Sequence, residues 1–182
     1  MKLRYGLMMF CCLPLFSQAE GVAEGCRSFH VPSGTFRRWD EPKALSDQPF
    51  SDQQGRAFRL ADFRGRPLLV HFWGTWCPPC VVEMPAMARL ARRPPVDDLL
   101  VLPISRDSGG AKQILAFYRE NSIQGLPVTA DRWGKLAYEL RINKVPETLY
   151  VNRQGREIGR LTGMLDWDEE RVRAHLAACL EP

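Results

Sequence analysis

The sequence predicts an α/β fold with a central mixed sheet flanked by helices. Two apolar runs, residues 67–72 and 99–105, have the length of buried strands, and each is followed by a segment with helical spacing. Two further strand-like runs, residues 148–152 and 157–162, are joined by a short turn and precede a last helix. Strands separated by helices favour parallel pairing and a tight turn favours antiparallel pairing, so the sheet should be mixed.

Length and charge narrow the class of protein. A chain of 182 residues can form one domain with a sizeable core but not two full-sized domains. The charged fraction of 25% and the hydrophobic fraction of 45% are globular values, which argues against a disordered or fibrous protein. The formal net charge is +4, and the arginines are scattered among acids rather than clustered. We therefore expect no nucleic-acid binding.

The first residues have the pattern of a secretory signal. Lys2 and Arg4 precede a mostly apolar stretch at residues 5–16, and Ser17-Gln18-Ala19 offers small residues at a cleavage site. We predict a signal peptide at residues 1–19 and export to the periplasm. The alternative is an uncleaved membrane anchor, but the apolar stretch is shorter than the ~20 residues that span a bilayer.

Residues 20–47 contain Gly, Pro, Ser and mixed charge without sustained periodicity, which predicts an N-terminal extension. The folded domain is expected over residues 48–182. It should begin with a β-hairpin over residues 48–60, where aromatic residues flank Gln53-Gln54-Gly55, followed by a short turn at residues 61–65.

The remaining elements follow from apolar spacing. Pro94 and Pro95 end the first helical pattern, since proline cannot continue a helix. In order, we expect a strand at 67–72, a helix at 81–92, a strand at 99–105, a helix at 111–121, a strand at 126–129, a helix at 133–140, strands at 148–152 and 157–162, and a helix at 166–180.

The motif Cys77-Pro78-Pro79-Cys80 lies where the first buried strand meets the first helix. Free backbone N–H groups and the positive end of the helix dipole stabilise a thiolate there, which makes Cys77 the expected nucleophile. Cys80 is close enough to attack a mixed disulfide formed by Cys77, so it is the expected resolving thiol.

Two other uses of the motif are open. Half of a zinc site would need two more ligands, yet no second C-x-x-C or paired histidine lies at a suitable spacing. An inert structural disulfide is the other, but Trp76 and two prolines around a helix start suit an exposed redox pair better. We expect no metal and no cofactor.

The run LLVHFWGTWCPPCVVEMP and the later run KVPETLYVNRQG resemble the TlpA/ResA/DsbE (CcmG)-like thiol-disulfide oxidoreductases, and the TlpA type most. The resemblance covers residues 49–180. It implies a thioredoxin-like fold with an N-terminal β-hairpin and one helix-strand insertion before a cis-proline loop. It also implies a cis Val145-Pro146 bond, with the backbone of Val145 free to pair with a substrate strand.

Glu147 is the acid of the sequence P-E-T, which resembles the same motif in cytochrome c maturation members of the family. The alternative is that Glu147 is a solvated acid in a loop. Trp76 is expected as a partly exposed wall beside Cys77. Glu83 follows Cys80 by one helical turn. The resemblance implies an acid that tunes the thiols through partial burial, and the alternative is a solvated acid that complements the helix dipole.

His71 departs from the family, whose members resemble one another in carrying Asp or Asn at this position of the central strand. A histidine beneath the disulfide could accept the proton of Cys80. The alternative is a hydrogen-bonded core histidine. The family's usual role at this position is therefore open.

The resemblance implies a periplasmic reductase in cytochrome c or cytochrome oxidase maturation. Its substrates would be disulfides of apocytochrome c or of copper chaperones, and its electrons would come from a membrane thiol donor of the DsbD or CcdA type. An oxidase or isomerase on the same fold is one alternative. A Cu(I)-handling protein is another, because Met84 and Met87 lie near the two thiols.

Without the signal peptide the chain keeps Cys26 and Cys179 besides the active pair. An even count in an exported protein permits a structural disulfide between them. Two independent thiols or an intermolecular bridge are the alternatives.

Overall fold

The computed structural model describes residues 25–181. The predicted signal peptide lies outside the described residues. Within residues 25–181, none of the helices combines the length and the apolar character needed to cross a membrane.

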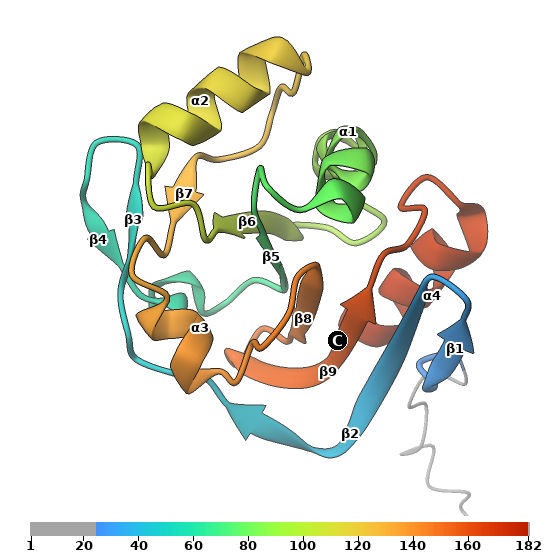
Figure 1. Cartoon of the computed structure of the whole chain (residues 1–182). Helices are drawn as coiled ribbons and strands as arrows, with labels where there is room; N and C mark the ends of the chain where they lie inside the picture. The colour runs from blue at the N-terminus through green and yellow to red at the C-terminus, as the bar shows by residue number, and fades with distance from the viewer. Residues whose placement is uncertain (1–24, 182) are drawn as a thin grey trace, which may run out of the picture.

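The described chain forms a mixed sheet and four α-helices (Figure 1). The strands are β1 (Phe29–Val31), β2 (Gly34–Ala44), β3 (Phe50–Asp52), β4 (Ala57–Phe58), β5 (Leu68–Trp73), β6 (Leu100–Ser105), β7 (Thr129–Ala130), β8 (Glu147–Val151) and β9 (Arg156–Gly163). The helices are α1 (Pro78–Arg92), α2 (Ala111–Glu120), α3 (Lys135–Glu139) and α4 (Glu170–Leu180), with a 3-10 turn at Leu60–Phe63.

The strand order is β1-β2-β9-β8-β5-β6-β7-β3-β4. The central strand β5 pairs in parallel with β6 and antiparallel with β8, so the predicted mixed sheet is confirmed. All six residues of β5 are buried, as its continuous apolar run predicts for a strand covered on both faces.

Two hydrophobic cores lie on opposite faces of the sheet. Leu69 and Trp73 of β5 pack into a core with buried residues of α1, α2 and α4. Leu68, Val70 and Phe72 point to the other face and pack with residues of α3 and the 3-10 turn. Successive residues of a strand alternate between faces, so β5 holds both layers together.

The predicted helices and strands from residue 48 onward are confirmed, with shifted ends. Helix α1 begins three residues earlier than its apolar pattern indicated, because Pro78 and Pro79 occupy its first two positions, where no intrahelical N–H bond is needed. Strand β7 is only two residues long and begins after Pro127, which has no N–H to donate to a sheet.

Strands β1 and β2 were not predicted from the sequence, because they come from the segment that we interpreted as an extension. The structure pairs β2 with β9 along one side of the sheet. Only Gly34 and Phe36 of β2 are buried, and its later residues are mostly exposed. A strand with so little buried surface has no clear alternation in its sequence.

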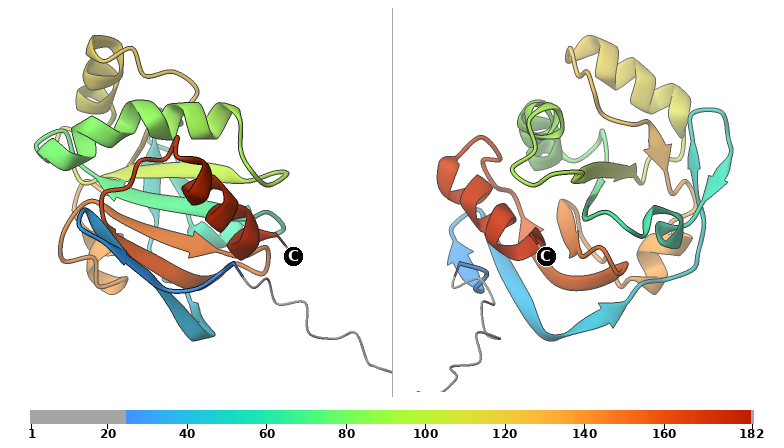
Figure 2. Two further views of the ribbon diagram at one scale, coloured as in Figure 1. Left: turned by 90° about the vertical axis from the view of Figure 1, so that its right-hand side faces the viewer. Right: turned by 180° about the vertical axis from the view of Figure 1, so that it is seen from behind.

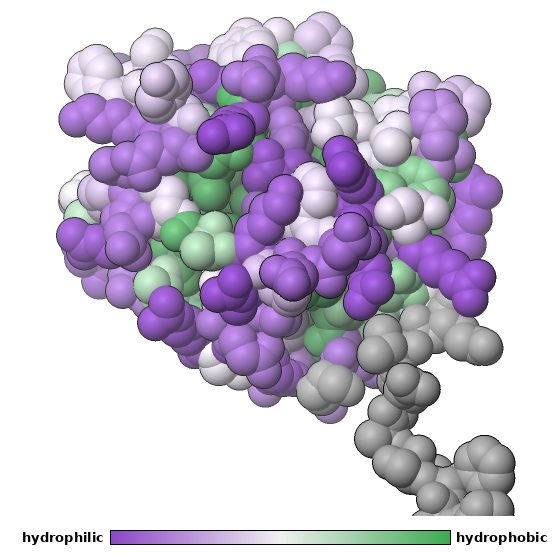
Figure 3. All heavy atoms as spheres, turned by 90° about the horizontal axis from the view of Figure 1, so that it is seen from below, coloured by the Kyte–Doolittle hydropathy of each residue, from purple (hydrophilic) through white to green (hydrophobic). Residues whose placement is uncertain are grey.

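Charged and polar side chains cover most of the underside of the molecule, with small apolar patches between them (Figure 3). This is the face on which the outer strand β2 runs in Figure 1. The exposed pattern of β2 therefore agrees with its position at the surface.

A disulfide joins Cys26 to Cys179, whose Cα atoms are 4.7 Å apart. Cys26 precedes β1 and Cys179 lies in the last turn of α4, and Figure 2 shows β1 beside that helix. Both residues are buried in the larger core. The bond therefore links the start of the described chain to its end.

Replacing both cysteines, as in Cys26→Ala/Cys179→Ala, should lower the free energy of unfolding by up to about 5 kcal/mol. The disulfide closes a loop with a sequence separation of 153 residues, and the unfolded chain loses entropy when such a loop is closed. Urea unfolding of the oxidised protein measures the change. A midpoint equal to that of the unsubstituted protein would show that the bond adds nothing to stability.

Candidate active site

The Cys77–Cys80 pair lies at the start of α1, directly after the buried strand β5. Cys77 is the residue that caps the helix, and its Sγ accepts the backbone N–H of Cys80 at 3.3 Å. The two cysteines form a disulfide with a Cα distance of 5.3 Å. The structure is therefore that of the oxidised protein at this pair.

The two sulfurs differ in access. Cys77 is 4% exposed and Cys80 is 0% exposed, while Trp76 beside them is 59% exposed. The turn that presents them is anchored by Asp107, a buried residue after β6. Its carboxylate accepts the N–H of Thr75 at 3.0 Å and the hydroxyl of Thr75 at 2.9 Å. These bonds hold the chain in place just before Cys77.

The loop before β8 faces the pair. The Val145-Pro146 peptide bond is cis, and the carbonyl oxygen of Val145 lies 3.6 Å from the Sγ of Cys77. A cis bond turns the chain sharply, which brings the backbone of residue 145 to the sulfur.

Glu83 and His71 meet beneath the pair in the interior. His71 is 0% exposed and Glu83 is 3% exposed. The Nε2 of His71 lies 3.5 Å from the Oε1 of Glu83, and these two atoms have no other partner. The Nδ1 of His71 lies 2.9 Å from the hydroxyl of Thr148 on β8. Glu83 is therefore not a solvated surface acid.

Burial determines the charge of this pair. Desolvation raises the pKa of Glu83 to about 8, although hydrogen bonds from Trp167 and from the N–H of Leu165 oppose the shift. Desolvation also lowers the pKa of His71 to about 3. At neutral pH the favoured state is thus a protonated carboxyl beside a neutral imidazole. In that state the carboxyl O–H can donate to Nε2 and satisfy both unpartnered atoms.

The sequence model of the AhpC/TSA family matches residues 42–156, which include the pair, Glu83 and the cis-proline loop. The chain belongs to the AhpC/TSA family. Among curated relatives of this AhpC/TSA protein, the thiol:disulfide interchange protein DsbE of Pseudomonas aeruginosa is 31% identical over 71% of each chain. The thiol-disulfide oxidoreductase ResA of Geobacillus thermodenitrificans is 29% identical over 71% of this chain and 72% of its own.

Solved structures show the same fold. A putative DsbE from Chlorobium tepidum matches with a TM-score of 0.66 at 20% identity, covering 77% of this chain and 98% of its own. An exposed lipoprotein thioredoxin from Streptococcus pneumoniae matches with a TM-score of 0.57 at 23% identity, covering 68% and 93%. The predicted thioredoxin-like fold is confirmed, and this AhpC/TSA protein is a thiol-disulfide oxidoreductase of the ResA/DsbE type.

Glu147, the residue after the cis-proline in this AhpC/TSA protein, is buried rather than solvated. Burial raises its pKa above the ordinary value, and the guanidinium of Arg160 partly offsets that shift. Arg160 Nη1 donates to Glu147 at 3.1 Å and to the carbonyl of Leu140 at 2.9 Å. Its Nε donates to Glu157 at 2.7 Å. This network fixes both sides of the cis-proline loop.

Four residues that contact or anchor the site in this AhpC/TSA protein were not predicted. They are Asp107, Thr148, Arg160 and Trp167. Thr148 could have been found from the sequence, because it directly follows the P-E pair, but the others are distant and carry no local motif.

The two methionines near the pair lie inside the core. Met84 and Met87 are both 0% exposed. Within residues 25–181, no group of three or more His, Cys, Asp and Glu side chains is arranged to hold a metal ion. The buried positions of these two methionines therefore do not support the alternative of a Cu(I)-handling protein.

Replacing Trp167 with phenylalanine should raise the pKa of Glu83 further. The indole Nε1–H donates to the Oε2 of Glu83 at 2.8 Å, and a donor to the charged form lowers the pKa of an acid. The carboxyl titration can be followed by carbon NMR. Trp39→Phe is a matched control, since that indole donates to Glu157 instead. Equal Glu83 titrations in the wild type and Trp167→Phe would contradict the role of this hydrogen bond.

Proposed function

We propose that this protein is an exported reductase that transfers electrons from Cys77 and Cys80 to disulfides of other proteins. One observation supports it above all. The Cys77–Cys80 disulfide lies at a helix start, 3.6 Å from the backbone carbonyl of a residue that precedes a cis-proline. This arrangement joins a reactive sulfur to a backbone edge on which a substrate segment can lie.

The proposed reaction starts from the reduced pair. The thiolate of Cys77 attacks one sulfur of the substrate disulfide, and the displaced substrate sulfur leaves as a thiolate that takes up a proton. The thiolate of Cys80 then attacks Cys77, which releases the second substrate sulfur as a thiol and forms the Cys77–Cys80 disulfide. Two electrons and two protons pass to the substrate.

The positions of the two sulfurs suit these roles. Cys77 is the more exposed sulfur and accepts an N–H at the helix start, which stabilises its thiolate. Cys80 is fully buried, so its proton must pass to a group inside the protein or to the leaving sulfur. Glu83 lies one turn further along α1 and shares a single proton with His71. Because Glu83 already carries that proton at neutral pH and burial lowers the pKa of His71 to about 3, the proton of Cys80 passes to the leaving substrate sulfur.

We further propose where the protein acts. The signal pattern at residues 1–19 supports export to the periplasm, where proteins carry disulfides. The likeness to DsbE and ResA supports a role in cytochrome c or cytochrome oxidase maturation. Its substrates would be apocytochrome c or copper chaperones, and a membrane thiol donor of the DsbD or CcdA type would reduce it again.

Reduction of insulin by dithiothreitol, followed by turbidity, tests the activity. The wild type should accelerate it, and the Cys77→Ser variant should behave like dithiothreitol alone. The Cys26→Ala/Cys179→Ala variant is the matched control and should keep the rate. A wild type with no effect on insulin would contradict the proposal.

A further inference from the structure

A surface hollow of about 640 Å³ opens beside the active site. Four segments line it, and Glu139 of α3 is the acid among the lining residues. The residues that we use are Arg106 after β6, Trp133, Lys135 and Tyr138 in the α3 region, and Asn143 in the loop before the cis-proline, while Gln48 completes the lining. We call these five residues the insertion surface, because most of them come from the helix-strand insertion.

The insertion surface is continuous with the active site. Asn143 precedes by two residues Val145, whose carbonyl oxygen lies 3.6 Å from the Sγ of Cys77. The backbone N–H of Arg106 donates to the carbonyl of Trp73 at 2.9 Å, just before the turn that carries the pair. Figure 1 shows α3 and the N-terminal end of α1 both turned toward the viewer. A chain held at Cys77 can therefore extend onto this surface.

Two large aromatic side chains of this surface have little contact with the protein. Trp133 is 78% exposed and Tyr138 is 84% exposed. Such rings are usually at least half buried, and exposed ones near a functional site are typical anchors for a partner. The guanidinium of Arg132 lies 5.5 Å from the Trp133 ring centroid, which adds a positive charge to the aromatic face.

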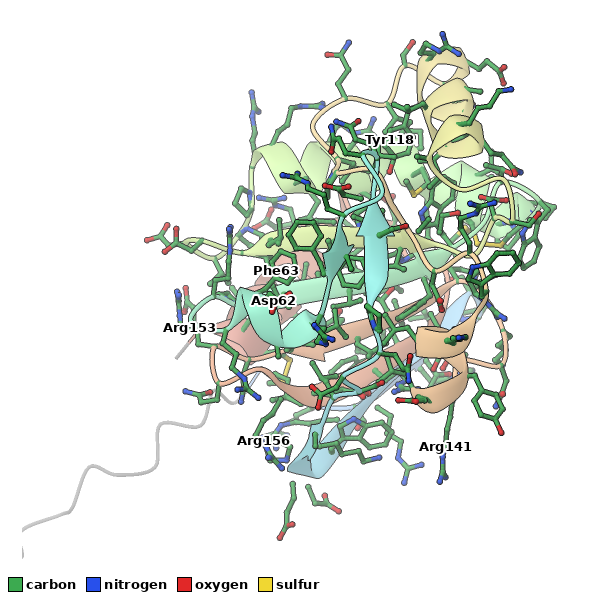
Figure 4. All side chains as sticks on the ribbon, turned by 90° about the vertical axis from the view of Figure 1, so that its left-hand side faces the viewer. Asp62, Phe63, Tyr118, Arg141, Arg153 and Arg156 are labelled. Carbon is green, nitrogen blue, oxygen red and sulfur yellow. A yellow bond between two sulfur atoms is a disulfide. The ribbon has the colours of Figure 1, made fainter. Side chains whose placement is uncertain are left out.

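Cations outnumber acids in this region: Arg106 and Lys135 line the hollow against the single acid Glu139, and further cations lie beside it. Among the ion pairs of residues 25–181, none involves the cations on or beside the insertion surface, namely Arg106, Arg132, Lys135, Arg141 and Lys144. Arg141 projects outward beyond α3 (Figure 4).

The carboxylates nearest in sequence are occupied by other donors. Asp107 accepts the N–H of Thr75, and Asp131 accepts the N–H of Ala137. Glu139, which lines the hollow, accepts hydrogen bonds from the neutral side chains of Gln48, at 2.8 Å, and Ser46, and forms no ion pair with Arg106 or Lys135. The cations are therefore available to an external acid.

We propose that the insertion surface binds an acidic segment that flanks the disulfide of the substrate protein. The proposal rests on the proposed reductase function and adds the substrate's charge. Arg106 and Lys135 would pair with the carboxylates, while Trp133 and Tyr138 would pack against the adjoining side chains. Complementary charge raises the rate of encounter, and this effect falls as salt rises.

Three synthetic peptides test the proposal. Each contains one Cys-x-x-Cys disulfide in the same sequence, with flanks of aspartate, asparagine or lysine. The reduced protein is mixed with each, and the second-order rate constant of reduction is measured at low and high salt. The wild type should reduce the aspartate peptide about tenfold faster than the asparagine peptide at low salt, with a smaller ratio at high salt.

Substitutions then locate the effect. Arg106→Gln/Lys135→Gln should bring the ratio of aspartate to asparagine rates close to one, and Lys135→Glu alone, at an exposed position, should lower it. Arg27→Gln/Arg38→Gln removes two exposed charges at the β1–β2 end of the chain and should leave the ratio unchanged. Trp133→Ala/Tyr138→Ala should lower the second-order rate constant for the aspartate peptide.

The possible negative results distinguish the reductase function from the preference for acidic substrates. A wild type that reduces none of the peptides contradicts the reductase function itself. A wild type that reduces all three at equal rates contradicts only the acidic preference. If both double charge variants lower the ratio alike, net charge is responsible and the insertion surface is not the binding site.

Discussion

The Cys80→Ser variant should accumulate a covalent complex with substrate, and the Cys77→Ser variant should form none. Without the Cys80 thiol, the mixed disulfide between Cys77 and the substrate cannot be resolved. The structure supports this order, because Cys77 is the sulfur with access to solvent and the one facing the cis-proline loop. Mixing each reduced variant with a disulfide-bearing protein and resolving the products on a non-reducing gel measures the result.

The matched control is the same pair of variants with Cys26 and Cys179 also replaced by alanine, so that only one thiol remains within residues 25–181. The complex should persist for Cys80→Ser and stay absent for Cys77→Ser. A complex that forms through Cys80 in the Cys77→Ser variant would reverse the assignment of nucleophile and resolving thiol.

The Glu83→Gln variant should lose the decrease in stability that the wild type shows as pH rises above about 6.5. Between pH 4.5 and 8, folded Glu83 keeps a proton that the unfolded chain has released, so unfolding becomes easier as pH rises. Between pH 3 and 6.5, the unfolded chain protonates His71 and the folded chain does not, so stability rises with pH. The two effects offset each other where they overlap.

The wild type should therefore lose about 2 kcal/mol of unfolding free energy between pH 6.5 and 8 from this pair. Glutamine resembles the protonated acid, since its amide can donate to His71 and accept from Trp167, and it does not titrate. Urea unfolding of the oxidised proteins at several pH values measures the difference. Glu120→Gln, at an exposed position of α2, is the control and should follow the wild type. Parallel curves for the wild type and Glu83→Gln would contradict the raised pKa.

The core of the fold could be predicted because its signals are local. Strand β5 is an uninterrupted apolar run, and α1 begins at two prolines directly after a cysteine cap. Strands β1 and β2 could not be predicted, because β2 gains most of its order from pairing with β9 rather than from burial. Pairing across 100 residues or more leaves no local pattern in the chain.

The site residues, too, were predictable where they belong to a local motif and not where their surroundings depend on distant parts of the chain. Cys77, Cys80 and Pro146 belong to short motifs, and the resemblance that those motifs carry predicted that they lie together. The environment of Glu83 depends on Trp167, which comes from the loop before α4, more than 80 residues later. Both a buried and a solvated Glu83 were therefore consistent with the sequence. The distance between His71 and Glu83 likewise depends on how α1 packs on β5.

The central claim is that the Cys77–Cys80 pair donates electrons to protein disulfides, and its reduction potential tests this most directly. The protein is equilibrated with dithiothreitol or glutathione buffers, the thiols are alkylated, and the reduced fraction of this pair is read by mass spectrometry. The account predicts a potential close to that of thioredoxin, about −270 mV. A potential close to that of the oxidant DsbA, about −120 mV, would show that the pair accepts electrons instead, and would contradict the account.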